Sequence, residues 1–541
     1  MAKAQGMPRV DAGKSGEARW QEAAPYRYVS LLEATLVTTS PLSISTGDAD
    51  ATGDQPLLRD AVGRPYIPAT GFVGALRQAL SRQVAQLCAP DPLKQRKDLE
   101  DAIVRLIGVS KGTQDDAMPM GQLYFDDLIP LDNEPQTERR DHVRIDPKTG
   151  VAKDKAKFDR ELLAVGSRFR LRIEWRTQES PRVLRNEDRT IIVLLMAILE
   201  GQASSPDAKR TPILSLGGRT RRGLGQVMIA GTGPQIAWRT FDLGTPTDLH
   251  RYILDSRQVG QPNLKSAAEL AKNLDVSMVK LSVGADLKLR LDLQIAGSLL
   301  IRGPGRALET EVTARQKTTQ AKLVADASHL RRPSVGAKKQ ESVISATALA
   351  GVLRHRAEAI VNTLTDGKGS VQLVEELFGT SPPSDDSQKQ KKPRAGHLCI
   401  AESVIRDAKE LRHTRVCIDP WTGGALDSAL FTEDALYGGR FSIELRCHPV
   451  GQQSVSKAAL GLLFLALRDL WEGDLPIGAE SSVGRGFVRA ISGELVVRQE
   501  SSRLAFRADG RLEPGPYHPM IGGWVAALQR HIGDPSVREE L

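Results

Sequence analysis

The sequence predicts an α+β protein built from two tandem ferredoxin-like (RRM-like) domains, and three observations point to this fold class. The chain of 541 residues repeats itself, with matching segments in the same order at a displacement of roughly 260 to 280 residues. Each copy opens on a predicted strand, at 27–39 and at 286–296, and the second strand alternates apolar and polar residues as a half-buried strand does. Each copy then continues with helix, central hairpin, helix and strand, which is the element order of that fold.

Four pairs of segments define the repeat. They are PATGFVGALR at 68–77 with SATALAGVLR at 345–354, LIGVS at 106–110 with LFGTS at 377–381, IDPKTG at 145–150 with IDPWTG at 418–423, and GGRTRRGLG at 217–225 with GAESSVGRG at 478–486. Repeat units in solenoids span only ~20 to 50 residues, so a displacement this long indicates two homologous domains in one chain. Function should therefore be sought in what both copies share.

The first segment pair predicts a helix in each copy. A hydroxyl just before an apolar periodic run can bond the free amides of a first helical turn, so Thr70 and Thr347 are expected to cap helices that end near Ala85 and Leu364. The remaining predicted elements are second helices at 188–201 and 457–472, strands at 224–231 and 486–497, and a polar, Pro-rich mobile insertion at 376–396.

These elements divide the chain into two domains with connecting and terminal segments. With 40% apolar residues, the chain can fill two cores of about 200 residues each. We expect the first domain at 26–235 and the second at 285–500, joined by a linker at 236–284. A disordered tail is expected at 1–25, and a C-terminal extension at 501–541 has no counterpart in the first copy.

Composition narrows the class of partner and the compartment. A formal charge of +8 favours a polyanionic partner, although a basic housekeeping enzyme is equally compatible with it. The cysteines lack Cys-x-x-Cys spacing, which argues against a disulfide frame or a zinc ribbon and for a reducing compartment. They are Cys88, Cys399, Cys417 and Cys447. Without a run of 18 apolar residues or a signal-peptide core, we expect a cytoplasmic protein with no membrane contact.

The two glycine-rich segments are the strongest chemical clue. Glycine lets backbone amides approach a phosphate closely, and Arg219, Arg221 and Arg222 would add positive charge beside the first segment. Neither segment is a nucleotide-triphosphate loop, because no Gly-Lys-Ser or Gly-Lys-Thr follows and each leads into a strand. The alternative is a tight turn whose glycines supply positive φ angles.

These motifs together resemble the RAMP superfamily. The helix motif ending at Arg77 and the two glycine-rich segments match its signatures, and residues 53–68 (GDQPLLRDAVGRPYIP) look like the backbone subunits of type III CRISPR effector complexes. The Ile-Asp-Pro-x-Thr-Gly segments are similar to that family's middle hairpin region. The resemblance covers about 26–235 and 285–500.

The resemblance implies a subunit that polymerises along a CRISPR guide RNA beside other effector-complex subunits. An inserted thumb hairpin in each domain would break the guide–target duplex, and the target RNA would be cut beside each break by a metal-dependent reaction that requires a loop aspartate. Motif matching places that residue at Asp54 in the first domain and, through a looser alignment, at Asp326 in the second. Mg²⁺ or another divalent cation is the implied cofactor.

That chemistry is plausible for a single carboxylate. The ribose 2′-hydroxyl supplies the nucleophile, so the protein needs only to position the strand and stabilise charge. An aspartate ionised at neutral pH can recruit Mg²⁺. Without the resemblance, an aspartate in a Gly-Asp turn is more simply explained by side-chain hydrogen bonding to its own backbone.

The expected RNA contacts come from the helix motif and the glycine-rich segments. They are Arg77, Gly217, Gly218, Arg219, Arg221, Arg222, Gly223, Arg354, Gly478, Ser481, Ser482, Gly484 and Arg485. Arg77 and Arg354 could equally extend from a buried helix face without touching RNA. The second domain departs from the family pattern, with Ser345 in place of proline and with Glu480-Ser481-Ser482 in place of the arginine-rich segment, so it is expected to bind RNA more weakly there.

Two rival functions remain open from the sequence. One is a purely structural RNA-binding subunit in which the aspartates only shape their loops. The other is a metal-independent endonuclease that processes precursor guide RNA, for which His142 and His413 would be the candidate bases. The two histidines differ in register by two residues, which favours ordinary hairpin positions. Because aromatic residues make up only 4%, RNA binding should rely on backbone contacts and be sensitive to salt.

Overall fold

The computed structural model describes most of the chain. The described residues are 26–45, 47, 54–87, 93–108, 121–146, 149–202, 210–231, 235–255, 264–277, 281, 285–303, 325–334, 340–365, 371–380, 394–450, 453–497 and 500–533. The predicted tail at 1–25 and most of the predicted insertion at 376–396 lie outside them.

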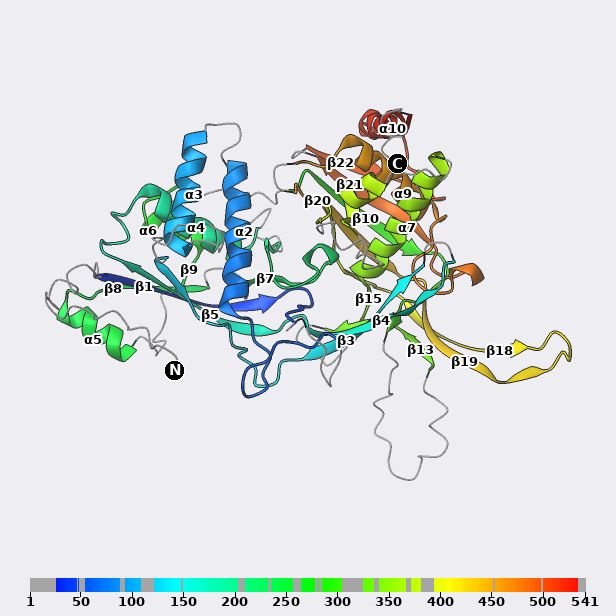
Figure 1. The fold of residues 1–541 in the computed structure, drawn as a ribbon, viewed down its shortest axis with the longest axis horizontal. Helices are drawn as coiled ribbons and strands as arrows, with labels where there is room; N and C mark the ends of the chain where they lie inside the picture. Colours follow the sequence, from blue (N-terminus) through cyan, green and yellow to red (C-terminus); the bar gives the residue numbers. More distant parts are fainter. Residues whose placement is uncertain are drawn as a thin grey trace, which may run out of the picture.

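The first unit is a ferredoxin-like sheet covered by helices on one face (Figure 1). Its strands β1 (Tyr28–Thr38), β2 (Leu123–Phe125), β5 (Arg168–Thr177) and β7 (Gln226–Ile229) lie in the order β2-β5-β1-β7, extended at the edge by β6 (Leu214–Ser215). All neighbours are antiparallel. The helices are α2 (Ala69–Leu87), α3 (Leu93–Ile107) and α4 (Asn186–Glu200).

The second unit repeats this arrangement. Its sheet has the order β16-β20-β10-β21-β22, with bounds β10 (Leu287–Ile295), β16 (Leu398–Ile400), β20 (Arg440–Cys447), β21 (Val488–Val497) and β22 (Glu500–Ala505). The helices are α7 (Ala346–Leu364), α8 (Val371–Phe378), α9 (Lys457–Glu472) and α10 (His518–Gly533). The predicted fold class, two tandem ferredoxin-like domains, is confirmed.

Helices α4 and α9, which precede the glycine-rich segments, are largely apolar because neighbouring elements enclose them, with Arg468 of α9 as an exposed exception. Helix α4 contacts α2, α3 and β7 as well as a later helix, α6 (Ala267–Asn273). Helix α9 contacts α7, α8, β21 and α10 in the same way. A helix in that position has little solvent-facing surface, which explains the unbroken apolar run from Ile191 to Leu199.

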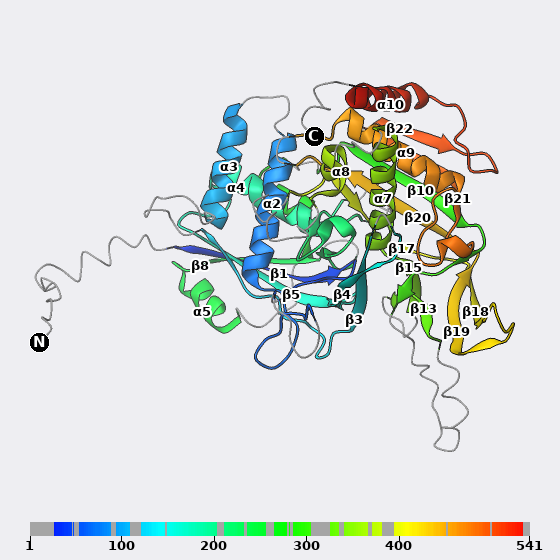
Figure 2. The same cartoon turned by 45° about the vertical axis from the view of Figure 1, so that its right-hand side comes forward.

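A long hairpin is inserted between the second and third sheet strands of each unit. The first hairpin pairs β3 (Thr137–Ile145) with β4 (Ala152–Leu163), and the second pairs β18 (Lys409–Ile418) with β19 (Ala425–Tyr437). The first hairpin runs beneath the second unit, whereas the second projects away from the rest of the molecule (Figures 1 and 2). The remaining short strands are β11 (Ser298–Leu299), β12 (Arg302–Gly303), β13 (Ala327–His329), β14 (Arg331–Pro333), β15 (Gln340–Ile344) and β17 (Ser403–Val404).

The segment predicted as a linker begins inside the first sheet. Strand β8 (Ile236–Asp242) pairs with the first half of β1, and β7 pairs with its last residues, so the two strands are halves of one interrupted fourth strand. In the second unit the matching strand β21 is continuous, with a bulge at the corresponding point, between Asp292 and Leu293 of β10. Polar residues at the interruption break the strand pattern, so the sequence did not predict that the strand continues beyond it. The rest of the segment contains α5 (Pro246–Asp255), β9 (Leu264–Lys265) and α6.

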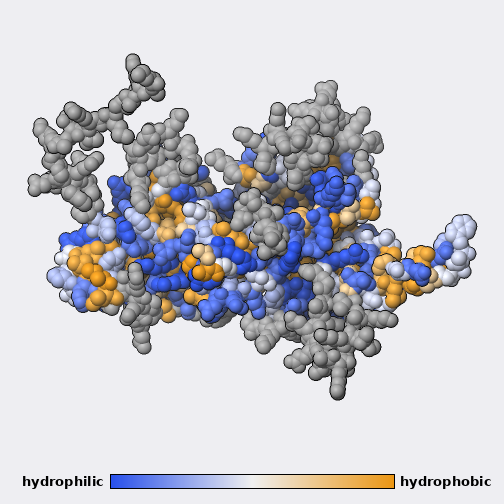
Figure 3. Space-filling model, turned by 60° about the horizontal axis from the view of Figure 1, so that its bottom comes forward, coloured by the Kyte–Doolittle hydropathy of each residue, from blue (hydrophilic) through white to orange (hydrophobic). Residues whose placement is uncertain are grey.

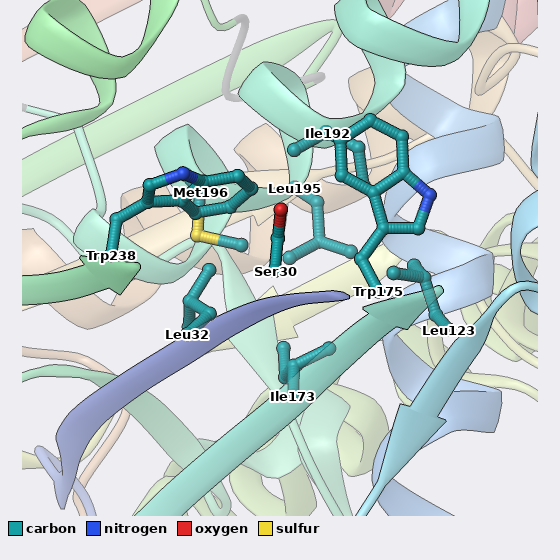
Figure 4. A pocket seen from close by; sticks show the side chains of 9 residues that line it. All are labelled: Ser30, Leu32, Leu123, Ile173, Trp175, Ile192, Leu195, Met196 and Trp238. Atoms are coloured by element: carbon teal, nitrogen blue, oxygen red, sulfur yellow. The ribbon is translucent and has the colours of Figure 1, made fainter. Parts of the chain in front are cut away.

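Trp238 of β8 packs on the first core. Together with side chains of β1, β5 and α4 it lines a cavity of about 10 Å³, enough for one water at most (Figure 4). The two tryptophans Trp175 and Trp238 meet edge to face with ring centroids 6.3 Å apart. Ser30 Oγ and Thr240 Oγ1 are hydrogen-bonded at 2.9 Å and join β1 to β8. Ligand binding in this cavity is excluded by its size.

The predicted C-terminal extension likewise packs on the second unit. Strand β22 adds to the edge of the sheet beside β21, and α10 lies over α9. Tyr517, Trp524 and Leu528 of this segment belong to the second core. The sequence comparison missed this because the first unit has no matching sequence.

The helix caps differ from the prediction. Ser345, not Thr347, is the N-cap of α7, and its hydroxyl accepts a hydrogen bond from the Ala348 amide. In the first unit Pro68 occupies the matching position, and the free amide of Ala69 is satisfied by Asp127 instead. Thr347 lies in the first turn, where its hydroxyl is 3.3 Å from Ser345 Oγ.

We expect Gly461→Ala to loosen α10. A Cβ at Gly461 would lie 2.3 Å from the Trp524 carbonyl oxygen of α10, so the two helices would have to separate. Overpacking of this kind costs about 1–3 kcal/mol of unfolding free energy. Gly351→Ala is the matched control, because its Cβ meets nothing within 4 Å and alanine favours the helix. Calorimetry should show a lower Tm for the first variant only, with faster proteolysis beyond residue 500; equal Tm values would contradict the packing argument.

Candidate RNA-binding and catalytic site

The two candidate aspartates occupy equivalent places. Asp54 Oδ2 accepts a hydrogen bond of 2.9 Å from the Asp159 backbone amide, and Asp326 Oδ2 accepts one of 2.8 Å from the Thr432 amide. Asp159 and Thr432 hold the same position in their hairpins, directly after the repeated phenylalanines. The structure therefore brings Asp326 to the counterpart of the Asp54 position, despite the looser sequence alignment.

Both carboxylates are presented to solvent at the base of a hairpin. Asp54 and Asp326 are exposed, and Oδ1 of each has no partner among the described residues. Beside Asp54 lies a hollow of about 220 Å³. It is lined by Gln55, Pro56, Thr137, Glu138, Arg139, Asp159 and Glu161. A phosphate or a hydrated cation would fit this space.

An arginine accompanies each aspartate and was missed by the sequence interpretation. Arg139 forms an ion pair with Asp159, whose Oδ1 accepts the Asp54 amide at 2.7 Å. Arg412 of the second hairpin donates two hydrogen bonds, of 2.7 and 2.8 Å, to Asp434. These arginines could have been found in the sequence, because each lies six residues before the isoleucine of an Ile-Asp-Pro motif. Arg139 thus lies one carboxylate away from Asp54, and Arg412 holds the matching position in the second hairpin, where it pairs with Asp434.

These residues fit a divalent cation only if RNA completes its coordination. Within the described ranges, no group of three or more His, Cys, Asp or Glu side chains could hold a metal ion. Mg²⁺ is, however, commonly held by one or two carboxylates together with substrate phosphates and waters. Asp54 and Asp326, each with one oxygen that has no partner among the described residues, match that mode of binding.

The two glycine-rich loops share one backbone conformation, in which glycines are needed for close contacts within the protein. We call residues 217–225 the first loop and 478–486 the second loop. A Cβ at Gly217 would lie 2.1 Å from the Ser43 carbonyl oxygen, and one at Gly478 would lie 2.4 Å from that of Leu300. Gly218 donates its amide to Ser43, so this amide does not point at a phosphate. The tight-turn alternative accounts for these glycines, and φ is positive at both ends of each loop.

The arginines of the first loop mostly contact the second unit. Arg221 donates to the Gly396 carbonyl, and Arg222 donates to the Phe378 carbonyl at 2.9 Å. A Cβ at Gly223 would lie 2.8 Å from the Glu402 backbone nitrogen. Arg219 is exposed and lies over the Phe158 ring, 5.2 Å from its centroid. Arg219 is therefore the first-loop arginine best placed to meet RNA.

The second loop is open but its charge is internally balanced. Ser481, Ser482 and Gly484 are exposed. Arg485 is buried and pairs with Glu433 at 3.0 Å and with Glu480 at 2.8 Å. The guanidinium of Arg485, which the sequence predicts to contact RNA, is paired with these two glutamates.

Arg77 and Arg354 support neighbouring helices. Arg77 donates to the Ile107 carbonyl at the end of α3, and Arg354 donates to the Gly379 carbonyl just after α8. Such bonds satisfy carbonyls that a helix end leaves free. The sequence left open whether these arginines contact RNA, and the structure assigns their guanidinium groups to protein.

A buried ion pair joins the first hairpin to the second unit. Arg140 donates two hydrogen bonds to Glu402, and their side chains are 5% and 3% exposed. Arg332 also binds Glu402, at 2.9 Å. Burial raises the pKa of the neighbouring Glu138 to about 7, against the attraction of Arg140. This cluster fixes where the hairpin lies.

The histidines do not form an equivalent pair. Hairpin register aligns His142, opposite Phe158, with Arg415, opposite Phe431, and it aligns His413 with Arg140. His142 stacks on Phe158, and burial together with nearby arginines lowers its pKa to about 4. A repeated histidine base, as a processing nuclease of two similar sites would need, is not present at these positions.

The comparison with known families agrees with the duplicated fold. A family model described as the RAMP superfamily matches residues 35–227 and 302–489, together well over half of the chain. The chain therefore belongs to the RAMP superfamily, and this membership makes it a CRISPR-associated RNA-binding subunit. Among curated proteins, none matches the sequence.

Membrane insertion through a helix finds no support in the described residues. None of the helices there has both the length and the apolar character needed to cross a bilayer.

We expect His142 to contribute a loss of stability on mild acidification, which Glu138 opposes because its raised pKa adds stability over the same pH range. Its pKa is lowered from 6.5 to about 4, so the unfolded chain takes up a proton first as the pH falls. Stability is present above pH 6.5 and is lost toward pH 4; between pH 7 and pH 5 the loss is about 2 kcal/mol. His142→Phe keeps the stacking and removes this proton uptake.

Denaturant unfolding of both proteins at pH 7 and pH 5 checks this. Between pH 7 and pH 5 the variant should lose about 2 kcal/mol less unfolding free energy than the natural chain. Glu138 titrates in both proteins, so its contribution cancels in the comparison. An identical pH dependence of the two proteins would contradict the assignment.

Glu402→Gln should destabilise the contact between the units. It removes the carboxylate that Arg140 and Arg332 share and leaves Arg140 paired with Glu138 alone, so the loss should lie at or below the about 3–5 kcal/mol typical of removing one partner of a buried pair. Asp132→Asn, which breaks the exposed Arg168–Asp132 pair, is the control and should change stability little. Comparable Tm losses in both variants would argue against a special role for Glu402.

Proposed function

We propose that this chain is a backbone subunit of a type III-like CRISPR effector that binds guide RNA and cuts complementary target RNA at two positions. The observation that supports the proposal most is the equivalence of Asp54 and Asp326. Each carboxylate is anchored through one oxygen to the equivalent backbone amide of its hairpin, and the other oxygen has no partner among the described residues. Two such sites in one chain suit a substrate with repeating geometry.

Each site has the charges that RNA cleavage requires. The hairpin would separate the strands and hold the backbone so that a 2′-oxygen, giving up its proton to water, attacks the adjoining phosphate and displaces the 5′-oxygen of the next nucleotide, which leaves a 2′,3′-cyclic phosphate and a 5′-hydroxyl. Arg139 or Arg412 would stabilise negative charge on that phosphate. A divalent cation bound by the aspartate and the phosphate would supply further charge stabilisation.

RNA binding by this chain should depend on phosphate contacts. Described residues contribute exposed basic groups such as Arg219, whereas aromatic residues are few. Affinity carried by phosphate contacts falls steeply with salt concentration because counterions are released on binding. Guide binding is therefore expected to weaken markedly between low and physiological ionic strength.

One observation favours the structural alternative. Asp54 and Asp159 exchange two hydrogen bonds between side chain and backbone, so Asp54 also shapes its own loop. In that alternative the aspartates position the hairpin and another subunit cuts the target. The decisive variant must remove the charge and keep the hydrogen bond.

Asp54→Asn and Asp326→Asn meet that requirement, because the asparagine Oδ1 can still accept the hairpin amide. The assembled complex with guide RNA and end-labelled complementary RNA should show two cuts from this chain in Mg²⁺. Each variant should lose one mapped cut by roughly 100-fold or more, with guide affinity unchanged. Asp509→Asn, an exposed aspartate in the turn after β22, is the matched control.

The outcomes separate the alternatives. Unchanged cutting in the double variant would establish the structural role for both aspartates. Cutting that continues in chelator would show that no divalent cation is needed.

A further inference from the structure

The two candidate aspartates have equivalent places, but their loops are held by different kinds of contact. In the second unit the contacts are made by backbone atoms. The Asp326 amide donates to the Thr432 carbonyl oxygen at 2.7 Å, and strand β13, which follows Asp326, pairs in parallel with β19. The Thr432 hydroxyl lies 3.2 Å from that of Thr414 on the neighbouring strand. The bonds that hold Asp326 therefore do not require the side chain of Thr432.

In the first unit, two carboxylates of β4 hold the loop that contains Asp54. The Asp54 amide donates to Asp159 Oδ1 at 2.7 Å. Three residues further on, the Leu57 amide donates to Glu161 Oε2 at 3.0 Å. One bond between backbone atoms accompanies them, from the Glu161 amide to the Gln55 carbonyl oxygen at 3.1 Å. Side chains of the hairpin thus replace most of the backbone ladder that holds the second loop.

Asp159 is the side chain on which the place of Asp54 depends most directly. It is buried, and its carboxylate is also paired with Arg139. Its own backbone amide donates to Asp54 Oδ2 at 2.9 Å. The carboxylate of Asp159 is therefore fixed between the Asp54 amide and the Arg139 guanidinium. Loss of this carboxylate would release the Asp54 backbone and, with it, the carboxylate proposed to bind a cation.

The surroundings of the two hairpins differ in the same sense. In the space-filling view, the surface over the first hairpin is mainly hydrophilic, whereas the projecting second hairpin bears apolar patches (Figure 3). A bond between a carboxylate and a backbone amide is charge-assisted and strong, but it depends on one side chain. A bond between two backbone groups is open to any residue except proline. A single substitution can therefore release the Asp54 loop, whereas the matching substitution leaves the Asp326 loop in place.

We propose that Asp159 is a positioning residue of the first candidate site, where it holds Asp54 in place to bind a cation beside the target phosphate. Thr432, at the matching position of the second hairpin, has no such role. The effect on cutting rests on the proposed function, because Asp159 acts through Asp54. The placement of the loop does not depend on that function.

The test compares Asp159→Ala with Thr432→Ala, its matched control, in the assembled complex with guide RNA, end-labelled target RNA and Mg²⁺. The cut of the first unit is the one that Asp54→Asn removes. Asp159→Ala should slow that cut by about 100-fold, the loss expected when a reacting group is misplaced by about 1 Å, and should leave the second cut unchanged. Thr432→Ala should change neither cut.

Asp159→Asn shows which bond of Asp159 matters. Its side-chain oxygen can still accept the Asp54 amide, but the charge that pairs with Arg139 is gone, so the first cut should stay within about threefold of the natural rate. A rate as low as that of Asp159→Ala would assign the effect to the ion pair with Arg139 and overturn the proposal. Loss of both cuts in Asp159→Ala would overturn it too, because such a loss indicates general damage to the fold.

Hydrogen exchange measured by mass spectrometry on the same complexes gives a readout that does not depend on cutting. In Asp159→Ala, the fragment that contains Asp54 should exchange about tenfold faster than in the natural chain, because an amide there loses its acceptor. The fragment that contains Asp326 should be unchanged in Thr432→Ala. Unchanged exchange at Asp54 would overturn the proposal. If the natural complex makes neither cut, the proposed function fails, and hydrogen exchange still decides whether Asp159 holds the loop.

Discussion

The buried ion pair between Arg140 and Glu402 is the interaction on which the arrangement of the molecule depends. It holds the first hairpin against the second unit, and with the hairpin it holds the loop of Asp54, whose carboxylate is bonded to β4. Desolvating both groups offsets much of their attraction, so the pair contributes less to stability than to geometry. A misplaced hairpin would leave Glu402 paired only with Arg332 and Arg140 paired only with Glu138, and the lost attraction favours the observed placement.

The two units share one backbone arrangement, but equivalent positions carry opposite charges. Arg160 and Arg219 of the first unit correspond to Glu433 and Glu480 of the second. In the first unit burial and the charge of Arg219 lower the pKa of Arg160 to about 10, because no described carboxylate pairs with it. In the second, Arg415 and Arg485 neutralise the two glutamates. The same scaffold thus offers a basic surface near one site and a balanced one near the other, so the two sites differ in how they can hold a phosphate.

Several features could be predicted because local pattern determines them. The alternating Leu287–Ile295 strand and the apolar helices α4 and α9 follow from periodicity and composition. Other predictions failed where a distant residue decides the outcome. Asp127 satisfies the start of α2 where a hydroxyl cap was expected, and strand β8 continues a sheet across an interruption that resembles a linker. No local pattern indicated that Arg221 and Arg222 would donate to carbonyls more than 150 residues away, and their contact with RNA stays a prediction.

By itself the sequence determined the duplication, the ferredoxin-like order of each half and the pair of loop aspartates. All three can be recognised from short motifs and from the spacing of apolar residues. Only the tertiary structure decided that Asp326 occupies the counterpart of the Asp54 place, that Arg139 and Arg412 hold matching positions in the two hairpins, and that Arg221 and Arg222 bind carbonyls of the second unit. These facts depend on hydrogen bonds and ion pairs between segments far apart in the chain, and neither periodicity nor residue type encodes which distant partner a side chain will meet.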